Sequence, residues 1–169
     1  ESHLGYFAVF VSFFPQLIAG PIERSSKLLP QIRSLVSVKW NDIKIFEATR
    51  LIIWGMFKKI LIADRLGIIV DRIFDQHEQF STIGLFAGGV LFLIQIYCDF
   101  SGYTSIARGL ARLIGVELSI NWDFPLFRAS FSAFWSTWHI TLSRWFKDYI
   151  YIPLGGNRLS LAFWSLNIL

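Results

Sequence analysis

The residue with the clearest chemical potential in this sequence is His139, which lies in the stretch FWSTWHITLSRWF. An imidazole has an ordinary pKa of about 6.5, so it can accept a proton from a bound hydroxyl near neutral pH. Burial in apolar surroundings would favour the neutral form that a general base needs. The alternative is a structural histidine bonded to Ser136 or Ser143. The residues alone leave both interpretations open.

Other kinds of catalytic site are not indicated by the sequence. A Ser-His-Asp triad is disfavoured because Asp148 falls roughly opposite His139 on a helical wheel, and no serine stands in a nucleophile elbow. The other histidines, His3 and His77, are far from His139 and form no HxxxH or HExxH spacing. Since Cys98 is the only cysteine, no internal disulfide can form. We therefore expect direct base catalysis on a bound acceptor, without a metal ion or a bound cofactor.

Helical periodicity predicts that His139 lies on one amphipathic helix over residues 130–148. Ser136 and Ser143 lie three residues before and four residues after it, which would align them beside the imidazole. The tryptophans of this helix are expected to serve in packing and interface anchoring rather than in substrate stacking. The apolar face of the predicted helix consists of Phe131, Trp135, Trp138, Leu142, Trp145 and Tyr149.

The composition predicts an all-α, multi-pass membrane protein. Hydrophobic residues make up 54% of the 169 residues, and charged residues only 17%, against about 25% in soluble domains. The net charge of +4 is attributed to basic cytoplasmic loops, because no nucleic-acid-binding motif accompanies it. The expected partner is therefore the lipid bilayer, and no nucleic acid is expected.

The apolar runs and their interruptions predict the order of elements along the chain. Because the sequence begins at Glu1 rather than Met and stops at Leu169 inside an apolar run, we expect an internal part of a larger protein. The predicted elements are transmembrane helices near 4–22 and 82–100, tilted or re-entrant helices over 45–74, amphipathic helices over 101–115 and 130–148, and the start of a further span over 159–169.

Charged residues interrupt the apolar segment 45–74 at Lys58-Lys59 and Asp64-Arg65. Such groups are costly at the centre of a bilayer, so either they pair and face a water-filled cavity, or the segment forms two shorter helices. We favour the two shorter helices. Farther along, Asp99 and the following Ser101-Gly102 are expected to end the span over 82–100.

Two further patterns lie in the region 82–115. Arg108 and Arg112 are one helical turn apart and place two positive charges on one face. They could hold a phosphate or an acidic carrier of a substrate, or they could anchor the helix at the membrane interface by snorkelling. The spacing of Gly84 and Gly88 predicts close helix packing.

Three sequence blocks resemble hallmarks of the membrane-bound O-acyltransferase (MBOAT) family. They are FFPQLIAGPI at 13–22, YCDFSGY at 97–103, and the long block at 134–158 that contains FWSTWHITLS and DYIYIPLGGNR. The blocks follow the family order and are spread between residues 13 and 158, which is most of the length of the chain. The most similar branch is of the alginate O-acetyltransferase type, which is related to the D-alanyl transfer protein of teichoic acid modification.

The resemblance implies a fold in which transmembrane and re-entrant helices surround a tunnel in the bacterial inner membrane. It also implies transfer of an acyl group, expected to be acetyl, to hydroxyls of an exported polysaccharide or cell-envelope polymer. The donor would be cytoplasmic, such as acetyl-CoA or an acyl-carrier thioester. On the other side of the membrane, the partner would be the polysaccharide acceptor or a periplasmic or extracellular acyltransferase.

In the same resemblance, His139 matches the first of two histidine positions associated with activity, and the second would lie past Leu169. Two alternatives to acetyl transfer stay open at this point. One is D-alanyl transfer to teichoic acid. The other is a non-enzymatic membrane channel, transporter or scaffold, which the charged residues of the segment 45–74 would also suit.

Overall fold

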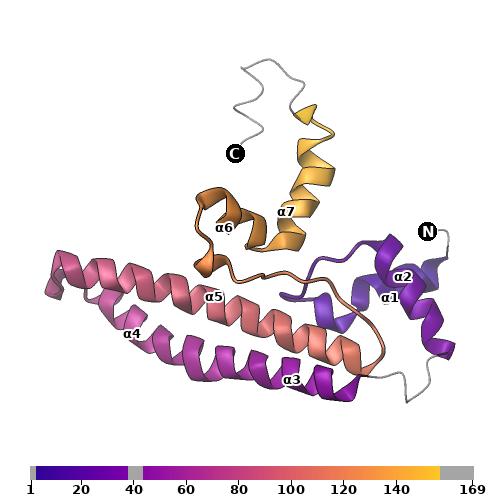
Figure 1. Cartoon of the computed structure of the whole chain (residues 1–169), viewed down its shortest axis with the longest axis horizontal. Coiled ribbons are helices and arrows are strands. Elements are labelled where there is room, and N and C mark those ends of the chain that lie inside the picture. The colour runs from indigo at the N-terminus through magenta and orange to yellow at the C-terminus, as the bar shows by residue number, and fades with distance from the viewer. Residues whose placement is uncertain (1–2, 38–43, 157–169) are drawn as a thin grey trace. The chain divides into compact units, whose positions relative to one another are not determined.

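The structure, a computed structural model, describes residues 3–37 and 44–156. Across these ranges the regular structure is helical and contains no strand, as the composition predicts (Figure 1). The chain divides into two compact units, residues 1–118 and 119–169. The predicted span over 159–169 lies outside the described residues.

The first unit is built on a long helical hairpin. One arm runs without a break through α3 (Ile45–Met56), the π-helix η4 (Phe57–Ala63) and α4 (Asp64–Asp75). The short 3-10 helix η5 (His77–Gln79) then reverses the chain. The other arm is α5 (Thr82–Leu113), which packs along the whole of the first arm (Figure 1).

The arm over 45–75 does not break into the two separate helices that we favoured. Lys58 and Lys59 bind polar groups of α5, and Asp64 pairs with Lys59 within the arm. The Lys58 ammonium is buried and donates hydrogen bonds to Ser101 O, Ser101 Oγ and Ser105 Oγ at 2.9–3.1 Å. Lys59 lies between two carboxylates, 2.9 Å from Asp64 Oδ1 and 2.6 Å from Asp99 Oδ1. A π-helical turn at 57–63 replaces the expected break.

The second arm corrects another prediction, because α5 is one helix of 32 residues. The expected boundary between the helices over 82–100 and 101–115 does not exist. Asp99 does not end the helix, since its carboxylate is paired with Lys59. Gly102 does not end it either, because it lies where the α3 backbone approaches. In the described part of the chain, α5 is the helix long and apolar enough to cross a membrane.

The amino-terminal segment also differs from the predicted span near 4–22. Helix α1 (Leu4–Ser12) has nine residues and is therefore about 14 Å long, which is less than the thickness of a bilayer core. The chain then becomes extended at Phe13 and forms the short 3-10 helix η1 (Phe14–Gln16). Pro15 explains the interruption, because proline lacks an amide donor and restricts the residue before it.

A small core joins this segment to the far end of the hairpin. Helix α2 (Ser25–Ser34) contributes Leu28, which is fully buried. The 3-10 helix η2 (Leu35–Ser37) follows α2. The buried residues of this core are Phe13, Leu28, Ala111, Val116 and Leu118.

The second unit contains the 3-10 helix η6 (Pro125–Phe127), α6 (Phe131–Thr137), α7 (Ile140–Phe146) and the π-helix η7 (Lys147–Tyr151). The single helix predicted over 130–148 is therefore wrong, because it is interrupted at Trp138 and His139 (Figure 1). The apolar face inferred from one continuous helical wheel is divided between two helices. Turn residues follow at 152–155.

Glycines set the distance between the two arms of the hairpin. A Cβ atom at Gly55 would lie 2.6 Å from the carbonyl oxygen of Gly102, and one at Gly109 would lie 2.8 Å from that of Ala48. Of the predicted Gly84 and Gly88 pair, Gly88 packs against another helix, with Ile73 as its neighbour. The arms can approach this closely only without side chains at these points.

We predict that Gly55→Ala destabilises the hairpin, because its methyl group would collide with backbone that cannot move independently. The expected loss is about 1–3 kcal/mol, as for other overpacked sites. It would be measured as a lower midpoint of thermal unfolding in detergent. Gly89→Ala is the matched control, since nothing lies within 4 Å of its Cβ position and alanine favours a helix by up to about 1 kcal/mol. Equal midpoints for the two variants would contradict the packing argument.

Candidate functional site

His139 lies at the junction between α6 and α7 in an unusual backbone conformation. Its φ of 42° and ψ of 54° place it in the left-handed region, which few residues other than glycine adopt. Such a conformation costs on the order of 1–3 kcal/mol and persists only where the surroundings impose it. The preceding residue, Trp138, is extended, so the chain turns sharply between the two helices.

The imidazole of His139 caps the helix that follows it. Its Nδ1 atom accepts a hydrogen bond from the Leu142 amide at 3.3 Å. In this arrangement the neutral ring carries its proton on Nε2, so a group that approaches Nε2 meets an N–H donor. Burial lowers the pKa of His139, and hydrogen bonding to its own backbone opposes this effect. The neutral imidazole is therefore favoured near neutral pH.

Aromatic rings surround the junction on the side of α6. The Trp122 ring lies 5.7 Å from the imidazole and meets Trp138 edge to face at 4.6 Å. Phe134 stacks on Trp138 at 5.3 Å. Trp138 thus serves in packing, as the sequence indicated, and it forms part of an apolar wall beside the histidine.

The two serines expected beside His139 bind backbone atoms. The Ser136 hydroxyl donates to the carbonyl of Ala133 at 2.9 Å, and the Ser143 hydroxyl donates to the carbonyl of His139 at 3.3 Å. The helix break removes the alignment that a continuous helix would have given them. Among the hydrogen bonds described here, the imidazole is held by a backbone amide rather than by a serine hydroxyl.

Asn121 is a residue of this site that the sequence analysis does not single out, and it lies between the predicted helices over 101–115 and 130–148. It is 1% exposed, and its backbone carbonyl oxygen accepts a hydrogen bond from the Ile140 amide at 2.9 Å. Its side-chain Oδ1 accepts both the amide and the hydroxyl of Thr141, at 3.1 and 3.0 Å. The available signal was the residue type, because asparagine readily caps helix ends.

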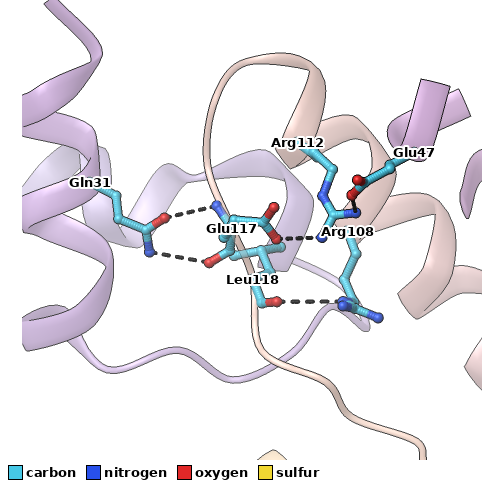
Figure 2. Close-up of polar contacts among 6 residues, drawn as sticks. All are labelled: Gln31, Glu47, Arg108, Arg112, Glu117 and Leu118. Atoms are coloured by element: carbon cyan, nitrogen blue, oxygen red, sulfur yellow. Dashed lines mark hydrogen bonds and ion pairs between the residues drawn. The ribbon is translucent and has the colours of Figure 1, made fainter. Parts of the chain in front are cut away.

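The arginines proposed as donor-binding residues form part of a polar network in the first unit (Figure 2). Arg112 lies 2.8 Å from Glu47 Oε2 and 2.6 Å from Glu117 Oε2. Arg108 donates from Nε to the carbonyl of Leu118 at 3.4 Å. The side chain of Gln31 exchanges two hydrogen bonds with the backbone of Glu117, at 2.8 and 3.1 Å.

This network ties the segment after α5 to α2 and α3 (Figure 2). Two carboxylates oppose the charge of Arg112, and its side chain is only 16% exposed. The contacts therefore give Arg112 and Arg108 a structural role. Binding of an anionic acyl donor by this pair stays a prediction from the sequence.

A second group of polar side chains lies beside the ion pairs of Lys59 in the first unit. It lines a cavity of about 270 Å³ that includes Asp64, Asp71, Gln95 and Asp99. No three histidine, cysteine or acidic side chains in residues 3–37 and 44–156 are grouped so that they could hold a metal ion. The cavity is thus polar and charged, but it does not have the form of a metal centre.

Sequence comparison relates the chain to known acyltransferases. It is 41% identical over 158 residues to a peptidoglycan O-acetyltransferase of Helicobacter pylori. The aligned region covers 94% of this chain and 30% of the relative. The chain is 38% identical over 152 residues to a probable alginate O-acetylase of Pseudomonas putida, with 90% and 30% covered. A teichoic acid D-alanyltransferase of Streptococcus thermophilus is 28% identical, with 91% and 38% covered.

The chain spans about 30% of the length of the two O-acetyl-transferring relatives. The sequence model of the membrane-bound O-acyltransferase family matches residues 2–169, which is nearly the whole chain. This match agrees with the blocks at 13–22, 97–103 and 134–158. The chain therefore belongs to the membrane-bound O-acyltransferase (MBOAT) family.

Proposed function

We propose that this protein transfers an acyl group, acetyl in the first instance, to hydroxyls of an exported polysaccharide or cell-envelope polymer. The observation that carries the proposal is the histidine of the family block at 134–158. His139 is partly buried, held in a strained conformation at a helix junction and bordered by Trp122. Strained, partly buried ionisable groups are typical of functional sites.

The proposed reaction exchanges a thioester for an oxygen ester. The hydroxyl oxygen of the acceptor attacks the carbonyl carbon of a donor such as acetyl-CoA or an acyl-carrier thioester, which we place on the cytoplasmic side. A C–O bond forms and the C–S bond breaks. The hydroxyl proton leaves to a base, and the thiolate leaves with the electron pair of the C–S bond and is then protonated. The site must orient the hydroxyl and control this proton.

His139 suits both tasks in sequence. With Nδ1 bonded to the Leu142 amide, the Nε2–H group can hold the acceptor oxygen or stabilise the developing charge on the carbonyl oxygen. To accept the proton of that hydroxyl, the ring must present a lone pair at Nε2, which requires that the bond from Leu142 open and that the ring proton lie on Nδ1. The inferred order is therefore orientation first and proton transfer second.

The acyl group is proposed from the relatives. The relatives named for O-acetyl transfer to peptidoglycan or alginate are 38–41% identical, whereas those named for D-alanyl transfer are 26–28% identical. We therefore place acetyl before D-alanyl. The polar cavity at Lys59 favours a second candidate, a passage for a polar solute, which would need no reactive histidine.

We predict that His139→Asn in the complete protein reduces acyl transfer by about 100-fold or more, the usual range for loss of an acid–base group. Asparagine tolerates the left-handed region and caps helices, so this variant keeps the junction while it removes the imidazole. The measurement is the ester-linked acetate that mild alkali releases from the envelope polymer of expressing cells. Protein amount in the membrane is checked by immunoblot.

The matched control is His77→Asn, which changes an exposed histidine of the first unit. It should leave the acetate content unchanged. Full acetylation by the His139→Asn variant would remove the histidine from the reaction. A flux of polar solute that persists in the His139→Asn variant, together with normal acetylation by that variant, would favour the passage instead.

We also predict the pH dependence of transfer. The reaction needs neutral His139, and burial lowers the pKa of this group below its ordinary value of 6.5. The neutral form therefore persists at lower pH than for an exposed histidine. The acid limb of the transfer rate, measured in membranes between about pH 5 and pH 8, should have its midpoint below 6.5. A midpoint above 6.5 would contradict this assignment.

A further inference from the structure

We propose that Asn121 is a positioning residue that holds His139 in its reactive orientation. Its effect on transfer rests on the proposed function, whereas its effect on the imidazole does not. The proposal starts from the first turn of α7, where a helix normally leaves its amide groups without partners. Here the backbone carbonyl of Asn121 accepts a hydrogen bond from the Ile140 amide. The side-chain Oδ1 of Asn121 accepts one from the Thr141 amide.

These bonds act directly on the residue before them. Ile140 and Thr141 follow His139 without an intervening residue, so fixing their amides fixes ψ of His139. The Thr141 hydroxyl adds a third bond to Asn121 Oδ1, and both side chains are at least 95% buried. Water cannot replace a lost partner at such a buried site, so each of these hydrogen bonds is costly to break.

The same connector also holds the end of α6. The Asp123 amide donates to the carbonyl of Thr137 at 3.2 Å, two residues before His139. The connector from 121 to 123 thus forms hydrogen bonds with the chain on both sides of Trp138 and His139. A residue other than glycine keeps a left-handed conformation only where several contacts hold it there, and these bonds supply such contacts for His139.

The sequence favours a different conformation, which these hydrogen bonds oppose. The periodicity of residues 130–148 favours one continuous helix, in which His139 would have ordinary helical angles and its Nδ1 atom would not cap Leu142. Loss of the two Oδ1 bonds to Thr141 removes the side-chain part of this opposition, while the backbone bonds of Ile140 to Asn121 and of Asp123 to Thr137 remain. The imidazole would then turn away from its present direction, and its tautomer would no longer be set by the capping bond.

One further observation distinguishes the two halves of the Asn121 amide. Oδ1 accepts two hydrogen bonds, whereas the buried Nδ2 has no hydrogen-bond partner among the described residues. The hydrogen bonds of the side chain are therefore made by its acceptor oxygen. Aspartate preserves that oxygen, and leucine replaces it with a methyl group at similar size.

The test compares Asn121→Leu with Asn121→Asp in the complete protein. Nitrogen NMR of histidine-labelled protein in detergent reports the tautomer of His139, whose signal is assigned by its absence in His139→Asn. We expect wild type and Asn121→Asp to share one defined tautomer, and Asn121→Leu to show a mixture. The transfer rate at saturating donor should fall about 100-fold in Asn121→Leu, with little change in KM for the donor, and recover in Asn121→Asp.

Thr141→Val keeps the experiment decisive if Asn121→Leu does not fold. It removes one hydroxyl bond and leaves the amide bond to Oδ1, so a smaller shift of the same NMR signal is expected. An unchanged His139 signal in a folded Asn121→Leu or Thr141→Val variant would overturn the positioning role, whatever the activity. If His139→Asn is fully active while the NMR shift is present, the proposed reaction fails but the positioning of His139 stands.

Discussion

Wherever a helix ends or bends in an apolar environment, its exposed amide and carbonyl groups must find partners within the protein. This constraint governs how the two helix interruptions, after α1 and before α7, are stabilised. After α1, the side chain of Gln16 donates to the carbonyl of Phe10 at 2.7 Å. At the junction before α7, three successive amides, those of Ile140, Thr141 and Leu142, are accepted by Asn121 and His139. Each interruption is thus stabilised by a polar side chain that serves the backbone.

The same constraint connects the structure of His139 to its proposed chemistry. The imidazole that completes the cap of α7 is also the group assigned to the reaction. Because Nδ1 serves the backbone, Nε2 is the atom left to carry the chemical role, and its proton is set by the cap. A histidine on a continuous helix would have no such preference between its two nitrogens. The helix break therefore supplies chemical definition as well as shape.

The sequence predicted the helical class and a long apolar helix that begins at residue 82, because these depend on composition and on one long apolar run. The catalytic role of His139 stays a prediction. The sequence did not predict the break at His139 or the continuity of α5. Periodicity records only which residues share a face, and it cannot register a hydrogen bond between Asn121 and Thr141, 20 residues apart. In α5, the local pattern predicts a helix end at Asp99, but the Asp99 carboxylate pairs with Lys59 and the helix continues to Leu113. In both cases a distant polar partner overrode the local pattern.

The two arginines illustrate the limit of reading charge from sequence. Arg108 and Arg112 form a positive face only if nothing opposes it, yet Glu47 and Glu117 lie against Arg112. The attraction of these two carboxylates offsets the cost of desolvating the partly buried guanidinium. It also fixes the route of the chain after α5, since Gln31 holds the backbone at Glu117 from the other side (Figure 2). An anionic donor bound there would have to compete with two carboxylates already in place. Charge near a membrane surface therefore indicates a binding site only when the partners of that charge are known.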